Sequence, residues 1–450
     1  MPDDVTTTTA RPAVRAPRSA PALGPLLPAA GVGVLAVATF LLLRTALVDD
    51  AYITLAYARN VALHGTWGLL SDVTSNTATS PLWVLALSAV TVVVRRPVLA
   101  LGILHVAMAV ALTLSLTSLA RRTGLPRWTG PLGAVALGVN PLLLASVGLE
   151  SAFLVLLLTL LLLLGVARRP VLYGLVAGAV VLTRMDAGVV VVVLSLLLPG
   201  VLRRLHLAVL AALVVVVPWL AWSWFSLGSA VPDTVVIKTL QQPWGVYSMW
   251  NGPLLYLGVY SVDALVAFLP LVFGGLGWLV LLGFWRRPRP AVGPDRDGVH
   301  AQPWLAFGVA TAAHYAALSV LAVPPYHWYY AVLVAGTTLV AVAALGAVWA
   351  FRPIALGAGL AAAVLLVAGA GVDVRHGVPW VLAPVQSNFA EPRQYDVVAA
   401  GVAEVLAREG GPRRVESPGE IGHLAYACDC VVDQFADPAR LQPSIDQVEA

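Results

Sequence analysis

The sequence is dominated by long apolar runs that recur along most of its length, separated by short segments in which arginines are often paired. A bilayer core of about 30 Å takes roughly 20 apolar residues per helix, so these runs predict a polytopic, all-α membrane protein. Composition agrees, because only 11% of the residues are charged, whereas soluble proteins average roughly 25%. The predicted spans, about eleven in number, are 28–47, 81–94, 98–119, 151–167, 170–183, 188–202, 206–226, 263–285, 303–323, 328–350 and 353–371.

The arginines indicate how these spans are oriented. Positive residues collect on the cytoplasmic side of a membrane, and Arg11, Arg15 and Arg18 precede the first span. We therefore expect an uncleaved anchor with a cytoplasmic N-terminus in the plasma (inner) membrane. The residues that then fall on the cytoplasmic side are Arg95-Arg96, Arg168-Arg169, Arg203-Arg204, Arg286-Arg287 and Arg352.

One arginine pair does not fit this orientation. Arg121-Arg122 falls outside, and the apolar stretch 131–147 would invert the rest of the chain if it crossed the membrane fully. Because the stretch is interrupted at Asn140-Pro141, we expect a half-helix or re-entrant element there. An odd number of spans then places the C-terminus outside.

Charge divides the chain into three parts. Residues 1–27 are expected to form a disordered cytoplasmic tail and 28–371 the membrane domain. Residues 372–450 form a small extracytoplasmic region, in which twelve acidic residues stand against six arginines from Asp373 onward. The formal charge of +4 does not indicate a nucleic-acid partner, because the arginines are spread along the chain instead of gathering in one patch.

Four polar segments share the outer face on this topology, namely 48–80, 148–150 with 184–186, 228–250 and 324–330, and their convergence indicates a site. Asp49 and Asp50 open the first of them, and the apolar period of 51–63 predicts an interfacial helix. One Asp there is ordinarily a helix N-cap. Of two adjacent acids, one could deprotonate an incoming hydroxyl while its neighbour holds a cation or orients the acceptor.

The residues of this first segment resemble a known family. They read Asp49-Asp50-Ala51-Tyr52-Ile53, Tyr57-Ala58-Arg59-Asn60, His64-Gly65 and Thr79-Ser80-Pro81-Leu82-Trp83. The order is similar to the first outer loop of the bacterial C-type (GT-C) glycosyltransferases, which use polyprenyl-phosphate sugars. Relatives in that superfamily are the protein O-mannosyltransferases, the aminoarabinose lipid A transferases and the actinobacterial arabinofuranosyltransferases of cell-wall assembly. The resemblance implies that the first acid, Asp49, is the general base.

Three later segments extend the resemblance in the family's order. Gly148-Leu149-Glu150 resembles a Gly-Met-Glu turn, Thr183-Arg184-Met185-Asp186 resembles Thr-Arg-Pro-Asp with Met in place of Pro, and Pro232-Asp233-Thr234 before Lys238 resembles Pro-Asn-Thr with Asp in place of Asn. A lipid-phosphate donor needs cations, because negative charge builds on its phosphate as the bond to the sugar breaks. The candidate donor and substrate contacts are Arg59, Glu150, Arg184, Asp186, Lys238, Tyr326 and His327.

Plainer explanations stand beside these assignments. Arg184 could form a structural salt bridge with Asp186 or Glu150, and Lys238, the only lysine in the chain, could simply extend toward water. The segment 324–330 holds four aromatic residues and His327, which suits an interfacial belt as well as a platform for a sugar or the first isoprenes. No metal-ligand spacing is present, so no cofactor is assigned. A Mg²⁺ or Mn²⁺ ion on the oxygens of the acidic residues is left open.

The end of the chain reads as a small α/β region. A helix is expected over 394–409 and strands at 413–416 and 430–433. The run 419–426 resembles the family's Gly-x-Ile-Gly-Tyr segment. At fewer than 80 residues this region is small for independent folding, so it should lean on the membrane domain. Cys428 and Cys430 are expected on one face of a strand, since two cysteines two apart could close only a strained bridge.

The sequence thus predicts a membrane glycosyltransferase. It would move a mannose- or arabinose-like sugar from a polyprenyl-phosphate donor to a cell-envelope glycan, lipid or protein acceptor on the outer face, with an Asp base. A transporter or flippase of lipid-linked sugars is the first alternative, although such a protein favours charges near the bilayer midplane. A catalytically inactive homologue that acts as a complex partner is the second.

Overall fold

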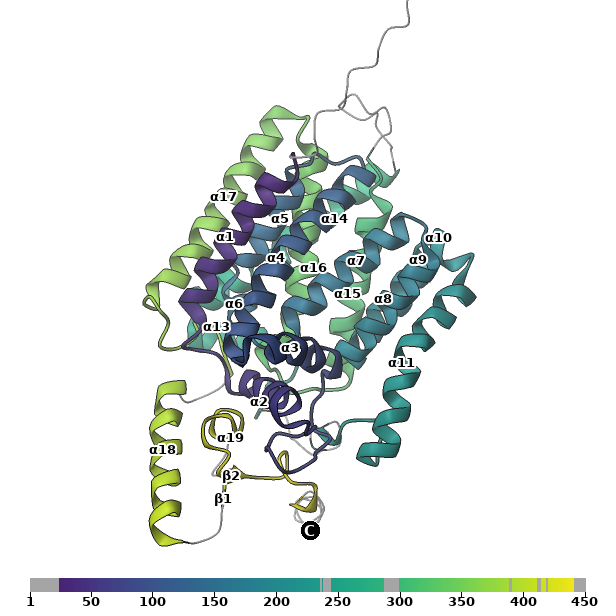
Figure 1. The fold of residues 1–450 in the computed structure, drawn as a ribbon. Helices are drawn as coiled ribbons and strands as arrows, with labels where there is room; N and C mark the ends of the chain where they lie inside the picture. Colours follow the sequence, from purple (N-terminus) through teal and green to yellow (C-terminus); the bar gives the residue numbers. More distant parts are fainter. Residues whose placement is uncertain are drawn as a thin grey trace, which may run out of the picture.

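The computed structural model describes residues 24–234, 237, 244–286, 299–387, 391–410, 414–417 and 420–440. These residues form a bundle of helices with a smaller C-terminal region at one end (Figure 1). The helices of the bundle are α1 (Leu26–Leu43), α2 (Asp49–His64), α3 (Pro81–Val94), α4 (Pro97–Arg122), α5 (Thr129–Gly138), α6 (Pro141–Ala145), α7 (Ser151–Val166), α8 (Pro170–Thr183), η1 (Met185–Ala187), α9 (Gly188–Leu197), α10 (Pro199–Leu202), α11 (Leu205–Leu227), α13 (Gly252–Tyr260), α14 (Val262–Arg286), α15 (Gln302–Val320), η2 (His327–Tyr330), α16 (Ala331–Val348) and α17 (Arg352–Arg375).

Proline and glycine set many of the helix bounds. Pro81, Pro97 and Pro170 each stand at the start of a helix, where the missing N–H leaves no hydrogen bond unmade. Gly65 and Gly228 end α2 and α11 in the left-handed conformation. Between these points the apolar sequences satisfy their backbone groups internally, as a hydrocarbon environment requires.

Six helices among the described residues are long and apolar enough to cross a membrane: α1, α4, α11, α14, η2 with α16, and α17. The helices α3, α7, α8 and η1 with α9 are apolar but shorter. The mostly helical membrane fold is therefore confirmed, whereas the number of eleven spans stays a prediction.

The direction of α4 differs from the prediction. Gly102 of α4 lies against the Phe40 ring, and Gly33 of α1 lies against Val110, so α1 and α4 run antiparallel. The Arg122 end of α4 is therefore beside the start of α1, and α3 lies with α2 at the opposite end of the bundle (Figure 1). Two predictions are corrected by this arrangement. The segment 81–94 does not run from one end of the bundle to the other, and Arg95-Arg96 lie at the end that carries Asp49.

The segment 131–147 also differs from its prediction. The interruption at Asn140-Pro141 is present between α5 and α6, but the two helices continue from the Arg122 end to the end where Gly148 lies against Ala51. Asn140 makes this possible, because its Oδ1 accepts the N–H groups of the next turn and its Nδ2 donates to the Ala267 carbonyl at 3.0 Å. The segment is thus not re-entrant.

This course of the chain removes the misfit of Arg121-Arg122, and Arg95-Arg96 at the Asp49 end become the pair that departs from the rule. Arg122 and Arg168 line one pocket together with His300, at the end of the bundle where α1 begins. The pair that the prediction placed outside therefore joins Arg168-Arg169.

The C-terminal region consists of α18 (Pro392–Glu409), α19 (Gly422–Cys428), η3 (Pro438–Arg440) and the parallel strands β1 (Val415–Glu416) and β2 (Val431–Val432). The helix and the strands lie where the sequence predicts them. The cysteines do not share a strand face, since Cys428 ends α19, Cys430 precedes β2, and the two form a disulfide. The chain turns between them at Asp429, whose φ is +52°. This turn brings the two cysteines together.

The C-terminal region does lean on the rest of the chain. It shares a buried apolar cluster with α2, α3 and the segment between them. The members of this cluster that lie at its centre are Tyr57, Leu69, Leu70, Ile421, Leu424, Ala425 and Val431.

Candidate functional site

The four polar segments converge at one end of the bundle, as the sequence predicts. Asn76 donates from Nδ2 to the carbonyls of Ser229 and Val231 at 3.1 and 3.2 Å. Thr234 donates from Oγ1 to the Thr77 carbonyl at 2.5 Å. These bonds join the segment 48–80 to the beginning of the segment 228–250.

The other two segments join the same end. The ring of Trp244 meets the ring of Tyr326 edge-on at a centroid distance of 4.8 Å. The guanidinium of Arg184 lies over the Tyr329 ring at 4.7 Å. Because Gly148 also packs against Ala51, the acidic start of α2, the Glu150 turn, the Arg184 turn and η2 form one neighbourhood.

Asp49 is the first residue of α2, and its carboxylate is held by the C-terminal region. Its side chain does not serve as the N-cap, which is Val48. Instead, Oδ2 accepts the backbone N–H of Gly422 at 2.9 Å and Oδ1 accepts that of His423 at 2.8 Å. Asp49 is only 6% exposed.

Burial has the largest effect on the pKa of Asp49. Loss of water raises the pKa of its carboxyl from 3.8 to about 7, and the neighbouring charge of Asp50 adds to the rise. The N–H groups of His423 and Gly422 work against it. The carboxyl is therefore poised between its two protonation states near neutral pH. Asp50 itself is half-buried in the same first turn of the helix.

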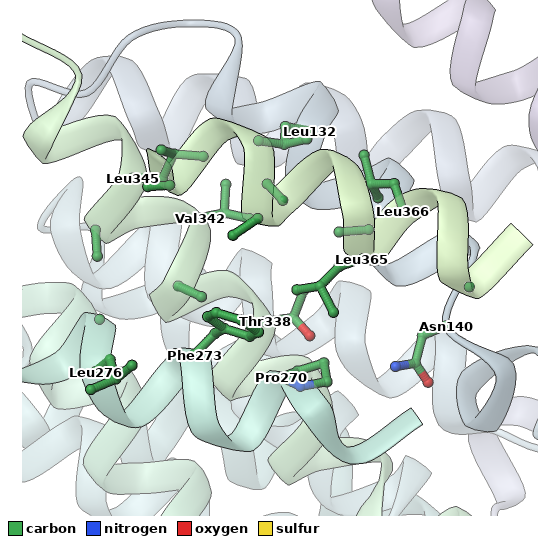
Figure 2. Close-up of a pocket in the computed structure, with 18 of the residues that line it drawn as sticks. Leu132, Asn140, Pro270, Phe273, Leu276, Thr338, Val342, Leu345, Leu365 and Leu366 are labelled. Carbon is green, nitrogen blue, oxygen red and sulfur yellow. The ribbon is translucent and has the colours of Figure 1, made fainter. Parts of the chain in front are cut away.

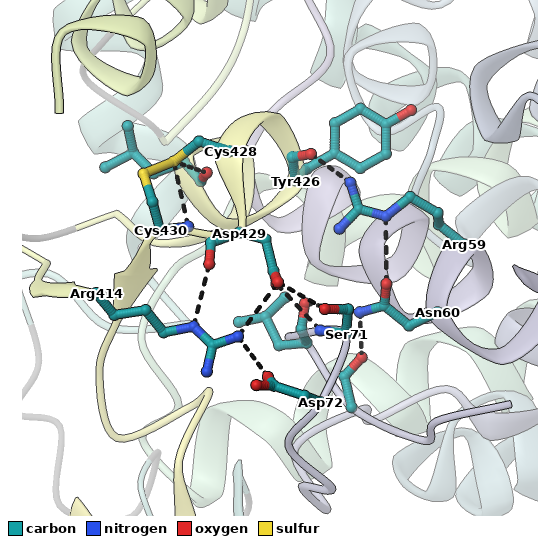
Figure 3. Close-up of polar contacts among 12 residues, drawn as sticks. Arg59, Asn60, Ser71, Asp72, Arg414, Tyr426, Cys428, Asp429 and Cys430 are labelled. Carbon is teal, nitrogen blue, oxygen red and sulfur yellow. Dashed lines mark hydrogen bonds and ion pairs between the residues drawn. A yellow bond between two sulfur atoms is a disulfide. The ribbon is translucent and has the colours of Figure 1, made fainter. Parts of the chain in front are cut away.

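Arg59 contacts the C-terminal region and not the other predicted donor contacts. Its Nη1 donates to the Tyr426 carbonyl at 2.6 Å, and its guanidinium lies 5.2 Å from the centroid of the Tyr426 ring. Its Nε donates to Oδ1 of Asn60 at 3.2 Å (Figure 3). These contacts give Arg59 a structural role in holding α19.

Arg184 is half-buried in an ion network and pairs with both of the carboxylates that the sequence offered as alternatives, Glu150 and Asp186. Its Nη1 pairs with Glu150 at 2.7 Å, while Nε and Nη2 form a two-pronged bond with Asp186 at 2.9 and 3.0 Å. Oδ2 of Asp186, which also accepts Nη2 of Arg184, lies 2.9 Å from Nε2 of His314. Burial disfavours its charge, yet the two carboxylates hold the pKa of Arg184 above its ordinary value.

Sequence reasoning missed His314. The residue lies in the middle of α15 among apolar neighbours and is buried. An ionisable side chain inside an apolar helix is itself a signal for a polar partner in the bundle. That signal indicates a partner but does not say that it is Asp186.

The aromatic segment forms a packed cluster. Tyr326 stacks on Trp328 at 4.7 Å with an interplanar angle of 19°. His327 is fully buried, with 0% exposure, and its Nδ1 lies 3.0 Å from Oγ of Ser387. The prediction that His327 donates to a phosphate at the surface is therefore not supported by its placement, whereas Tyr326 faces the 228–250 segment through Trp244. Lys238 lies outside the described residues.

A second set of contacts ties the C-terminal region to the loop between α2 and α3 (Figure 3). Asp429 accepts the backbone N–H of Ser71 at 3.0 Å and its hydroxyl at 2.6 Å. Arg414 pairs with Asp429 at 3.2 Å and also with Asp72. None of these residues was singled out from the sequence, since the contacts of Ser71 and Asp72 join segments more than 300 residues apart.

The arrangement does not favour a metal ion at the acidic residues. Within the part of the chain that the structure describes, no group of three or more His, Cys, Asp or Glu side chains is placed to hold one. Two N–H donors already point at the Asp49 oxygens, and Glu150 is paired with Arg184. A cation would compete with these positive partners, so we derive no step through a metal.

An apolar cavity of about 290 Å³ lies between α5, α14, α16 and α17 (Figure 2). Leu132, Phe273, Val342 and Leu365 are typical of its lining, and none of the predicted site residues belongs to it. Its surface suits a hydrocarbon chain better than a sugar or a phosphate.

The fold is similar to that of known proteins, although the sequence matches none of them closely. No protein-family model matches the chain, and no curated protein matches it in sequence. Among solved structures, it is similar to ArnT from Cupriavidus metallidurans in the apo state, with a TM-score of 0.58 and 17% identity over 95% of this chain and 89% of that chain. ArnT bound to undecaprenyl phosphate gives a TM-score of 0.55 at 18% identity over the same shares of both chains.

The chain is also similar to an archaeal enzyme. The apo oligosaccharyltransferase of Archaeoglobus fulgidus gives a TM-score of 0.53 at 14% identity, and the match covers 93% of this chain. The chain spans only 65% of the length of that protein. ArnT and this oligosaccharyltransferase are both GT-C glycosyltransferases, so the likeness confirms the predicted fold.

Proposed function

We propose that this chain, which has the GT-C fold, is a membrane glycosyltransferase that uses a polyprenyl-phosphate sugar donor. One observation carries the proposal: the buried carboxylate of Asp49 stands at the start of α2, where the polar segments of the sequence meet. The relatives support the class of donor, since ArnT was solved with undecaprenyl phosphate and the archaeal enzyme AglB with a dolichol-phosphate.

In this proposal the Asp49 carboxylate takes the proton from the acceptor hydroxyl. The acceptor oxygen then forms a bond to the anomeric carbon, the bond from that carbon to the phosphate oxygen breaks, and polyprenyl phosphate leaves with the electron pair. A pKa near 7 suits a base that works at neutral pH. Two N–H bonds leave the carboxylate with lone pairs for the acceptor, because its two oxygens offer about four acceptor positions. Direct attack opposite the leaving phosphate predicts inversion at the anomeric carbon.

We assign Arg184, Glu150 and Asp186 a supporting role in place of the predicted donor contact. The guanidinium of Arg184 is already shared by two carboxylates and an aromatic ring, which fixes the turns on which they stand. A donor phosphate therefore needs another cation. Lys238 remains our candidate, because the chain before it is bonded to the segment 48–80 and the chain after it packs on Tyr326.

The site is proposed to face the outside of the plasma membrane. Arg122 and Arg168 lie together at the end of the bundle opposite Asp49, and positive residues favour the cytoplasmic side. Arg95-Arg96, at the Asp49 end, are the exception to this pattern. The acidic C-terminal region packs on the Asp49 end. This side suits a donor whose lipid stays in the bilayer and an acceptor of the cell envelope, with mannose and arabinose as the sugars to test first.

The proposal can be tested with the purified protein in liposomes. Polyprenyl-phosphate mannose and polyprenyl-phosphate arabinofuranose, each with a labelled sugar, are supplied with cell-envelope lipid or glycan extracts as acceptor. We expect one donor to yield a labelled product with release of polyprenyl phosphate. Movement of the intact donor between leaflets without any product would instead establish a flippase.

A further inference from the structure

The start of α19 lies directly on Asp49, and Gly422 makes the closest approach. Its N–H donates to Oδ2 of Asp49 at 2.9 Å, and the N–H of His423 donates to Oδ1 at 2.8 Å. The carboxylate is thus held at both oxygens by the backbone of a segment that is 373 residues away in the sequence. Backbone donors of this kind orient a carboxylate without introducing a competing side chain.

Only glycine fits at position 422. A Cβ there would lie 2.1 Å from the Asp49 carbonyl oxygen and 3.0 Å from its Oδ2. The nearer atom belongs to the backbone of α2 and has no flexible side chain to yield. The requirement is one of space and not of conformation, because the φ of Gly422 is not positive.

The rest of α19 is fixed to the segment that carries Asp49. The His423 ring packs on Tyr52 at a centroid distance of 4.1 Å, and its Nε2 pairs with Asp396 at 2.7 Å. Farther along, the Tyr426 carbonyl accepts Arg59. The turn after the helix is held through Asp429, between the cysteines of the disulfide. With contacts along its whole length, α19 cannot shift on Asp49 without breaking several of them.

We propose that Gly422 is a positioning residue for the reaction: by fitting against the backbone of α2 and donating its N–H, it holds the Asp49 carboxylate in the orientation that accepts the acceptor's proton. This inference rests on the proposed role of Asp49. It makes the C-terminal region a part of the reaction centre and not an appended module.

The first test is Gly422→Ala in the full-length protein, assayed in liposomes with whichever of the two donors the wild type uses. The added methyl group should displace α19 from the carboxylate, and a displacement of about 1 Å can cost up to roughly 100-fold in rate. We expect kcat to fall about 10- to 100-fold, with the KM for the donor unchanged within about twofold. The acidic limb of the pH profile should shift as water reaches the carboxyl.

Gly401→Ala is the matched control. Gly401 is an exposed residue of α18 in the same region, and a Cβ there meets nothing within 4 Å. This variant should keep the wild-type rate and pH profile. Loss of rate in both variants would show that any added methyl group disturbs the region, and the positioning role would be overturned.

A second measurement does not depend on turnover. The infrared band of the protonated Asp49 carboxyl, identified by its loss in Asp49→Asn, reports the protonation of this group directly. Its midpoint should move in Gly422→Ala and stay in Gly401→Ala. Should Gly422→Ala fail to fold, Asp429→Asn, which weakens the far anchor of α19, should move the same band and lower kcat by a smaller factor.

The outcomes separate this inference from the proposed function. If Asp49→Asn is inactive while Gly422→Ala keeps the wild-type kcat, pH profile and infrared midpoint, the positioning role is wrong and the proposed function stands. If Asp49→Asn turns over normally, the proposed base is wrong. If Gly422→Ala is faster than the wild type, α19 covers the carboxylate instead of positioning it, which also overturns the inference.

Discussion

The Asp49 carboxylate in the first turn of α2 accepts the backbone N–H of Gly422 in the C-terminal region, at 2.9 Å. This bond connects two segments that the sequence separates by 373 residues. It joins the carboxylate at the start of α2 directly to the C-terminal region. The predictions below follow from this contact and from the ion network beside it.

Protonation of Asp49 should make stability depend on pH. The pKa of its carboxyl is raised from 3.8 to about 7, so the folded protein holds this proton at pH values where the unfolded chain has lost it. The contribution of Asp49 to stability should therefore be fully present below about pH 4 and be lost as the pH rises through about 7, by an amount of order 4 kcal/mol. Unfolding midpoints in detergent between about pH 4 and 8 measure the slope, and Asp49→Asn should make it smaller, leaving the part that Asp433 contributes. An equal slope in both proteins would contradict the burial argument.

Arg184 should be sensitive even to a conservative change. Lysine keeps the charge but cannot form the two-pronged bond to Asp186 while also reaching Glu150. We expect Arg184→Lys to destabilise the protein by about 2 kcal/mol, since lysine keeps the charge but loses at least one hydrogen bond to a carboxylate, worth roughly 1.5 to 3 kcal/mol. Arg169→Lys, at an exposed site, is the control and should leave the unfolding midpoint unchanged. Equal midpoints for the two variants would show that the network is not important for stability.

Asn140 should stabilise the interrupted α5–α6 segment through both ends of its amide. Asn140→Asp keeps the oxygen that caps α6 but loses the donor to the Ala267 carbonyl, whereas Asn140→Ala loses both. A cap and a buried hydrogen bond are each worth about 1 kcal/mol, so the unfolding free energy should fall by about 2 kcal/mol for Ala. It should fall further for Asp, because a buried carboxylate would then face the Ala267 carbonyl oxygen. An unfolding free energy for Ala equal to that of the wild type would show that the side chain does not stabilise the interruption.

The two arginine pairs that flank α4 should label from opposite sides of the membrane. In a background without the native cysteines, Arg95→Cys and Arg122→Cys each place a thiol at an exposed position. Because α4 runs antiparallel to α1, we expect Arg95→Cys to share its labelling side with Gly401→Cys of α18, and Arg122→Cys to label from the other side. Labelling of both arginine positions from one side would contradict the direction of α4.

Much of the bundle could be predicted from apolar length alone, because a hydrocarbon environment leaves a helix as the natural solution for such a run. The length of an apolar run does not show in which direction the helix crosses the bundle, however. For this reason α3 was predicted to be a span, although it lies at one end of the bundle. The misplaced pair Arg121-Arg122 was the signal that the direction of the chain had been assigned wrongly at this point. The sequence also indicated the interruption at Asn140. It did not indicate that the side-chain amide of Asn140 would cap α6 and also donate to the Ala267 carbonyl.

The sequence could predict which segments form the site, but not which side chains contact one another there. The sequence identifies Asp49, Glu150 and Arg184 as polar residues of neighbouring loops. It offers Asp186 or Glu150 as a partner of Arg184, but it does not say that both carboxylates bind at once or that His314 completes the network, because His314 comes from a helix distant in sequence. In the same way, the resemblance around Gly422 marked the segment without indicating which residue it touches.

The rate of sugar transfer by Asp49→Asn tests the central claim most directly. The exchange removes the proton acceptor while keeping the size of the side chain, and a general base contributes roughly 10²- to 10⁴-fold to a rate. With a labelled polyprenyl-phosphate donor and a folded variant, we predict that the single-turnover rate falls by at least about 100-fold. A rate equal to that of the wild type would contradict the account.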